Sequence, residues 1–94
     1  MEIRYAFARA LKAARKSKRL TQEDFSIVSS RTYLSTLERG QKSPTLDKID
    51  TLSKTIGIHL LTLIALACLH RENLDNPDAL LEEVRKELRH LLDG

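Results

Sequence analysis

The chain has 94 residues, which is enough for one small domain and too few for two separate cores. With 41% hydrophobic and 31% charged residues, its composition is that of a globular protein. A single cysteine excludes an intramolecular disulfide and favours a reducing compartment, so we expect a cytoplasmic protein. The most apolar run, residues 60–69, has about half of the roughly 20 residues that span a bilayer, and we expect no membrane partner.

Positive charge is concentrated in the first half of the chain. Residues 1–48 contain 11 lysines and arginines against 5 acidic residues, a net charge of +6, whereas residues 49–94 contain 5 against 8, a net charge of −3. This asymmetry indicates a polyanionic partner for the first half. The alternative is that these basic residues only solvate the first helix.

The composition favours an all-α fold, because leucine, alanine, lysine, arginine and glutamate are frequent and runs of β-branched residues are few. Apolar residues recur at helical spacing along most of the chain. We therefore expect six helices, over residues 2–18, from residue 22 onward, and over residues 31–38, 46–57, 60–70 and 77–92.

Capping residues mark where these helices begin and end. Serine, threonine and asparagine side chains accept hydrogen bonds at helix N-termini, so Thr21, Thr45, Asn76 and either Ser29 or Ser30 are expected to begin helices. Glycine adopts the left-handed conformation that ends a helix, which assigns Gly40 and Gly57 to C-termini.

The helix predicted over residues 31–38 has two different sides. Leu34 and Leu37 lie on one side, with Tyr33 beside them. The other side carries polar and basic side chains, namely Arg31, Thr32, Ser35 and Thr36. A helix with a narrow apolar side and an exposed side of this kind suits insertion into the major groove of DNA.

Four segments in order, TQED, RTYLSTLERG, SPTLDKI and KTIGIHLLTL, resemble the Cro/repressor-type helix-turn-helix family of bacterial and phage transcription regulators. The resemblance covers roughly residues 7–66. It implies a five-helix repressor-like DNA-binding domain over residues 1–70. Residues 71–94 would then form an additional C-terminal helical extension, part of the same compact unit or of a dimer interface.

The resemblance also implies roles for individual residues. Arg31, Thr32 and Thr36 match base-reading positions, with Ser35 close by, and Arg15 and Glu38 match a structural ion pair between two helices. The positions that commonly contact the DNA backbone are Gln22, Tyr33, Arg39, Lys42 and Ser43. The segment FSIVSS departs from the family, because it is about two residues shorter than usual and contains no glycine. We therefore expect an atypical angle between the two helices that it joins.

Two apolar segments near the C-terminus indicate a homodimer. Leucine and isoleucine occupy too many faces of helix 60–70 for one small core to cover, and helix 77–92 carries a leucine stripe of its own. The predicted interface consists of Leu60, Leu61, Ile64, Leu81, Val84 and Leu88. The alternative is that the last helix folds back and covers its own subunit.

No pattern for catalysis, metal binding or cofactor binding is present. The spacing of the candidate ligands His59, His70, His90, Cys68 and Glu72 matches no zinc-binding pattern. No phosphate-binding glycine loop or nucleophile elbow occurs. We predict a homodimeric regulator in the bacterial cytoplasm, associated with the nucleoid when it binds double-stranded DNA at a near-palindromic operator. The alternatives are an antitoxin-type autoregulator whose C-terminal helix binds a partner protein, and a fold kept only as a scaffold.

Overall fold

The computed structural model describes all residues, 1–94, and confirms the predicted all-α class. It contains five α-helices, one 3-10 helix and no strand. The elements in chain order are α1 (Ile3–Ser17), η1 (Gln22–Phe25), α2 (Arg31–Glu38), α3 (Leu46–Ile56), α4 (Leu60–Arg71) and α5 (Asp78–Asp93). The first and last helices differ from the predicted bounds by a single residue at each end.

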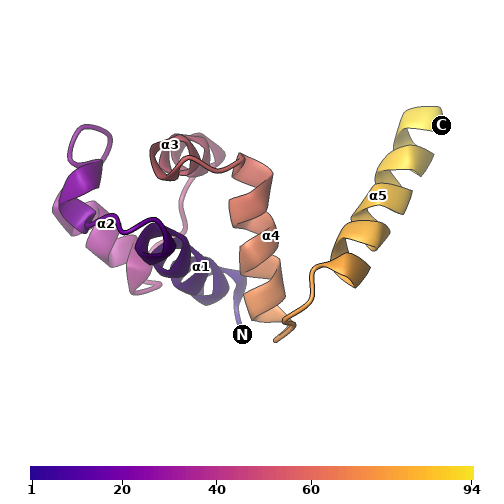
Figure 1. The fold of residues 1–94 in the computed structure, drawn as a ribbon, viewed down its shortest axis with the longest axis horizontal. Helices are drawn as coiled ribbons and strands as arrows, with labels where there is room; N and C mark the ends of the chain where they lie inside the picture. The colour runs from indigo at the N-terminus through magenta and orange to yellow at the C-terminus, as the bar shows by residue number, and fades with distance from the viewer.

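Helix α1 lies at the centre of the molecule, with α2 on one side and α4 on the other (Figure 1). Its contact with α4 is the most extensive between any two elements. Ala6, Ala8 and Ala10 of α1 are buried, so small side chains account for much of the buried surface of this helix. Together with α3, these elements enclose an aliphatic core that two phenylalanines complete. Its residues are Phe7, Ala10, Leu11, Ala14, Phe25, Leu34, Leu37, Leu52, Ile56, Leu63 and Ala67.

The helix expected after Thr21 is a short 3-10 helix, which corrects the prediction in this segment. The Thr21 N–H donates to Asp24 Oδ2 at 2.7 Å, so the expected N-terminal signal is present. Phe25 is fully buried and ends the element. The residues that follow are β-branched or serine, which disfavour helix continuation because they lose rotamer freedom or compete for backbone hydrogen bonds.

The ends of α2 and α3 follow the predicted chemistry, whereas α5 has Pro77 and not Asn76 at its N-cap position, and Asn76 Oδ1 accepts from the Asp78 N–H at 2.9 Å. Ser30, one of the two candidates, caps α2 by accepting from the Tyr33 N–H at 3.0 Å, and Thr45 caps α3 by accepting from the Lys48 N–H at 3.1 Å. Gly40 and Gly57 adopt positive φ angles of 72° and 87° just beyond the ends of α2 and α3. These left-handed residues let the chain turn away from each helix.

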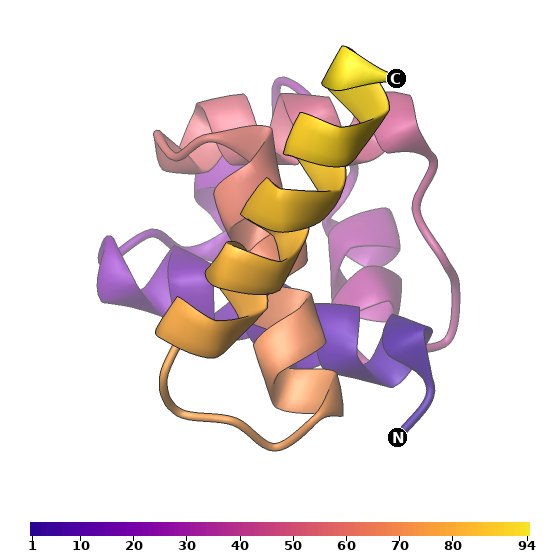
Figure 2. The same cartoon turned by 90° about the vertical axis from the view of Figure 1, so that its right-hand side faces the viewer.

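Helix α5 stands outside the rest of the molecule. It follows the loop after α4 and crosses in front of α4 when viewed from that side (Figure 2). None of its residues is buried. No single helix is both long and apolar enough to cross a membrane. Only α3 and α4 taken together reach that length and apolar content, and they meet at 104°.

The two glycines offer a matched test of the fold. The Cβ of an alanine at Gly57 would meet no atom within 4 Å. The substitution would lower the free energy of unfolding only through the strain of a left-handed alanine, about 1–2 kcal/mol. Alanine at Gly40 carries the same cost, and its Cβ would also overlap the ring of Tyr5. We therefore expect Gly40→Ala to lower the free energy of unfolding, measured in urea, by more than Gly57→Ala. Equal losses would mean that the Tyr5 ring moves aside without cost.

Candidate DNA-binding surface

Helix α2 presents one side to the core and the other to solvent. Leu34 and Leu37 are fully buried and anchor this short helix. Arg31 and Thr32, in its first turn, are exposed. The helix is therefore fixed by its apolar side and displays its polar side.

Five of the residues predicted to contact DNA lie together. They line an open hollow of about 370 Å³ that contains no hydrophobic side chain. Its residues are Gln22 from η1, Arg31, Thr32 and Ser35 from α2, and Arg39 just after α2. The turn between η1 and α2 thus gathers amide, hydroxyl and guanidinium donors in one concave surface, which suits phosphates and base edges.

The charged groups at this surface are held loosely. Arg31 Nη1 lies 4.0 Å from Glu23 Oε2, and both side chains are largely exposed. An exposed pair at this distance contributes little, so the Arg31 guanidinium can turn toward another acceptor. Arg39 Nη1 donates to Ser35 Oγ at 2.9 Å, which orients the hydroxyl inside the hollow.

Four other predicted residues lie outside the hollow, namely Thr36, Tyr33, Lys42 and Ser43. The Thr36 hydroxyl donates to the Thr32 carbonyl at 2.8 Å, so its hydrogen is used within α2. The Tyr33 ring lies between two ammonium groups, with Lys42 Nζ 5.9 Å and Lys48 Nζ 5.2 Å from its centroid. Tyr33, Lys42 and Lys48 thus form a basic cluster at one side of the hollow-lining helix, held by two cation–π contacts.

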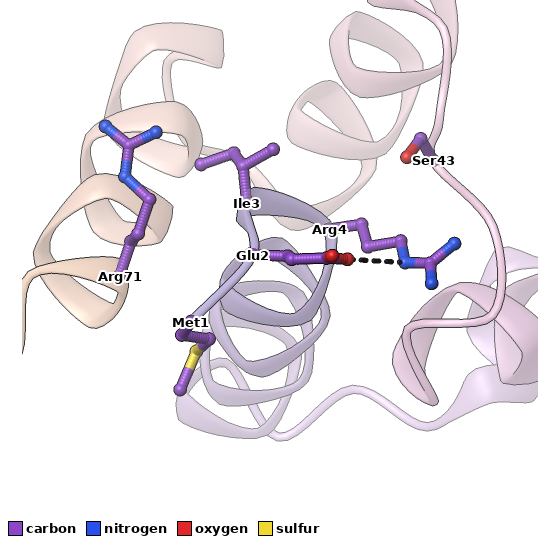
Figure 3. A pocket seen from close by; sticks show the side chains of 6 residues that line it. All are labelled: Met1, Glu2, Ile3, Arg4, Ser43 and Arg71. Carbon is purple, nitrogen blue, oxygen red and sulfur yellow. Dashed lines mark ion pairs between the residues drawn. The ribbon is translucent and has the colours of Figure 1, made fainter.

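Ser43 lies further away, at the N-terminal end of α1. It lines a hollow of about 600 Å³ with Arg4 and with Arg71 of α4 (Figure 3). Arg4 Nε pairs with Glu2 Oε2 at 3.4 Å on this surface. Ser43 therefore lies beside Arg4 and Arg71 and not beside the side chains of the α2 hollow.

A buried ion pair lies directly behind the hollow. Arg15 Nε donates to Glu38 Oε2 at 2.6 Å and Arg15 Nη2 donates to Glu38 Oε1 at 2.9 Å. The two side chains are only 9% and 4% exposed. The hydrogen bond to Glu38 raises the pKa of Arg15 against the opposing effect of burial. The Glu38 carboxylate therefore faces the interior and not the hollow.

The pair reaches two further segments. Arg15 Nη1 donates to the Leu20 carbonyl at 2.9 Å, and the Gln22 amide donates to Glu38 Oε1 at 3.2 Å. The buried Glu38 carboxylate thereby holds Gln22 at the edge of the hollow. Such contacts from behind a binding surface fix the geometry of the residues in front.

Two residues near this surface were not predicted from the sequence. Glu23 places a negative charge beside Arg31, and Lys48 of α3 reaches the turn before α2, where its Nζ donates to the Val28 carbonyl at 2.9 Å. The acidic residues in the first turn of η1 could have indicated a negative charge at Glu23 near the start of α2. No spacing rule pairs residue 48 with residue 28, because their contact depends on how α3 packs.

No group of three or more histidine, cysteine, aspartate or glutamate side chains is arranged to hold a metal ion. The concentration of hydrogen-bond donors and positive charge along α2 instead suits a polyanion.

The Arg15–Glu38 pair can be tested against an exposed pair of similar geometry. Arg15→Met leaves the Glu38 carboxylate buried without its partner, and we expect a loss of about 3–5 kcal/mol in the free energy of unfolding. The double variant Arg15→Met/Glu38→Leu should recover much of that loss. Arg85 donates to Glu82 at 2.9 and 2.6 Å on exposed α5, so Arg85→Met should have a much smaller effect. Similar losses in Arg15→Met and Arg85→Met would contradict this account.

Comparison with known proteins identifies the fold family. Residues 11–63, more than half of the chain, match the family described as helix-turn-helix. This span begins in α1, ends in α4 and contains η1, α2 and α3. No curated protein and no solved structure matches the chain. The chain therefore belongs to the helix-turn-helix family of DNA-binding transcription regulators, the Cro and repressor type that its sequence resembles.

Proposed function

We propose that this protein is a sequence-specific regulator that inserts α2 into the major groove of double-stranded DNA. The observation that carries the proposal is the polar hollow formed by η1 and α2 in a member of the helix-turn-helix family. Residues 1–70 would form the DNA-binding domain and residues 71–94 its extension. We place the protein in the bacterial cytoplasm, on the nucleoid when it is bound to its operator.

Arg31 is the principal base-reading residue of the proposal. Its guanidinium is exposed in the first turn of α2, the part of a recognition helix that approaches base edges. It can donate two hydrogen bonds to guanine O6 and N7. Thr32, Ser35 and Thr36 would contact neighbouring bases.

The remaining polar residues would grip the DNA backbone. Gln22 lies at the start of η1 and Arg39 at the end of α2, on either side of the proposed readers. Lys42 and Tyr33 belong to the adjacent basic cluster, where they would meet sugar and phosphate groups. Ser43 would make a more distant backbone contact. These interactions would fix register and orientation and would carry little sequence information.

We further propose that the chain acts as a homodimer. Leu61, Leu81 and Leu88 are 47–49% exposed, and Leu60, Ile64 and Val84 are partly exposed beside them. Helices α4 and α5 also flank an open hollow of about 510 Å³ lined mainly by apolar side chains. Apolar surface of this extent, with no buried residue in α5, favours coverage by a second copy.

The twofold symmetry of such a dimer would define its operator. Two copies of α2 related by this axis would read half-sites about 34 Å apart, one turn of DNA. The target would then be a near-palindrome.

The readout by α2 can be measured once selection from random DNA has supplied a preferred site. We expect Arg31→Ala to weaken binding to that site by about 1–3 kcal/mol, because one bidentate base contact is lost. Binding to random DNA should fall much less. Lys54→Met, which removes an exposed charge on α3, provides the control. Equal losses by Arg31→Ala on both DNAs would assign Arg31 to the DNA backbone.

The dimer surface can be tested by placing a charge in it. Leu61→Glu and Leu81→Glu should give monomers in sedimentation experiments and weaken operator binding, because each buries a carboxylate in the proposed interface. Leu92→Glu should remain dimeric, since Leu92 is 83% exposed and lies outside that interface.

Two results would favour a partner protein instead. One is a wild-type chain that sediments as a monomer, and the other is a stable complex with the product of a neighbouring gene after coexpression. The exposed α5 would then serve as an antitoxin-type binding element.

A further inference from the structure

One side-chain hydrogen bond links the turn before α2 to the rest of the molecule, and the Val28 side chain packs against the core. Within residues 26–30, the N–H groups of Val28 and Ser29 donate to the Phe25 carbonyl at 3.0 and 2.9 Å. The other hydrogen bonds of this turn also remain within η1, the turn or α2. The exception is the Val28 carbonyl, which accepts from Lys48 Nζ of α3 at 2.9 Å.

Lys48 is placed for this contact by the start of α3. Its backbone N–H donates to the Thr45 cap, so Lys48 lies in the first turn of the helix. Its ammonium group also lies 5.2 Å from the centroid of the Tyr33 ring on α2. One side chain therefore contacts both the turn and the helix that follows it.

The two ends of α2 are held by different contacts. The buried Arg15–Glu38 pair fixes the C-terminal end, while the N-terminal end, with Arg31 and Thr32, follows the turn that Lys48 contacts. The turn contains no glycine, and the Ile27 side chain beside Val28 is 98% exposed and anchors nothing. A change in the position of the Val28 carbonyl would therefore tilt the first turn of α2.

We propose that Lys48 is a positioning residue that fixes the orientation of α2 through its contacts with the Val28 carbonyl and the Tyr33 ring. It contacts no base in this role. Its effect on DNA is exerted through Arg31 and Thr32. The proposal rests on the proposed function, in which these two residues read the operator.

The test compares three variants of the full chain. Lys48→Met keeps most of the aliphatic stem and removes the donor, and Lys48→Arg keeps both charge and donors. Lys54→Met is the matched control, because Lys54 lies on the same helix, is exposed and pairs only with Asp50. Binding to the selected site and to random DNA is measured over a range of salt concentrations, together with the thermal midpoint.

We expect Lys48→Met to lose about five- to 150-fold in affinity for the selected site, the range that corresponds to one base contact. Its binding to random DNA and its salt dependence should match those of Lys54→Met. Repeating the selection with Lys48→Met should give weaker preferences at the bases that Arg31 and Thr32 contact. Lys48→Arg should restore most of the discrimination.

Other results would overturn the proposal. A similar loss on both DNAs, with a salt slope reduced by about one, would make Lys48 a phosphate contact. If the loss of affinity in Lys48→Met disappears when the variants are compared at equal folded fractions, the role of Lys48 is purely structural. Unchanged discrimination in Lys48→Met would remove the positioning role while leaving the proposed function intact. A wild-type chain that prefers no DNA sequence would overturn the proposed function and this proposal together.

Discussion

The guanidinium of Arg15 and the carboxylate of Glu38 lie in the interior and satisfy each other through two short hydrogen bonds. Two buried charges are tolerated only when they are paired and further hydrogen-bonded, and here the Leu20 carbonyl and the Gln22 amide complete the set. Because these groups come from α1, from the loop after it, from η1 and from α2, their pairing fixes all of them relative to one another. The surface that faces the proposed DNA partner is built directly on this pair.

The turn between η1 and α2 shows how a short connection can be specified without glycine. Phe25 fills the core, the serine and β-branched residues after it end the 3-10 helix, and Val28 packs against the core while its carbonyl accepts from Lys48. The conformation of the turn therefore depends on Phe25, which precedes it in sequence, and on Lys48, which follows it. In a helix-turn-helix protein this geometry determines where the first turn of α2 points.

Helices α4 and α5 contact each other much less extensively than α1 and α4 do. Helices α1 and α4 make the most extensive contact in the molecule, whereas α5 buries none of its residues. A helix with an apolar stripe gains stability mainly by packing that stripe against another surface. In the single chain Leu81, Leu88 and Leu91 of this stripe remain exposed and Val84 is half-buried, which is the physical basis for proposing a second subunit there.

The sequence by itself determined the helical class, most helix bounds and the caps, because these depend on local spacing and on single residues such as Thr45, Gly40 and Gly57. Its resemblance to the Cro and repressor family also indicated the side chains that α2 displays and the pairing of Arg15 with Glu38. Only the tertiary structure decided that the segment after Thr21 is a 3-10 helix, that Ser43 lies apart from the α2 hollow, and that Lys48 holds the turn. These features depend on contacts between residues distant in sequence, and local propensity and periodicity carry no information about which distant groups will meet.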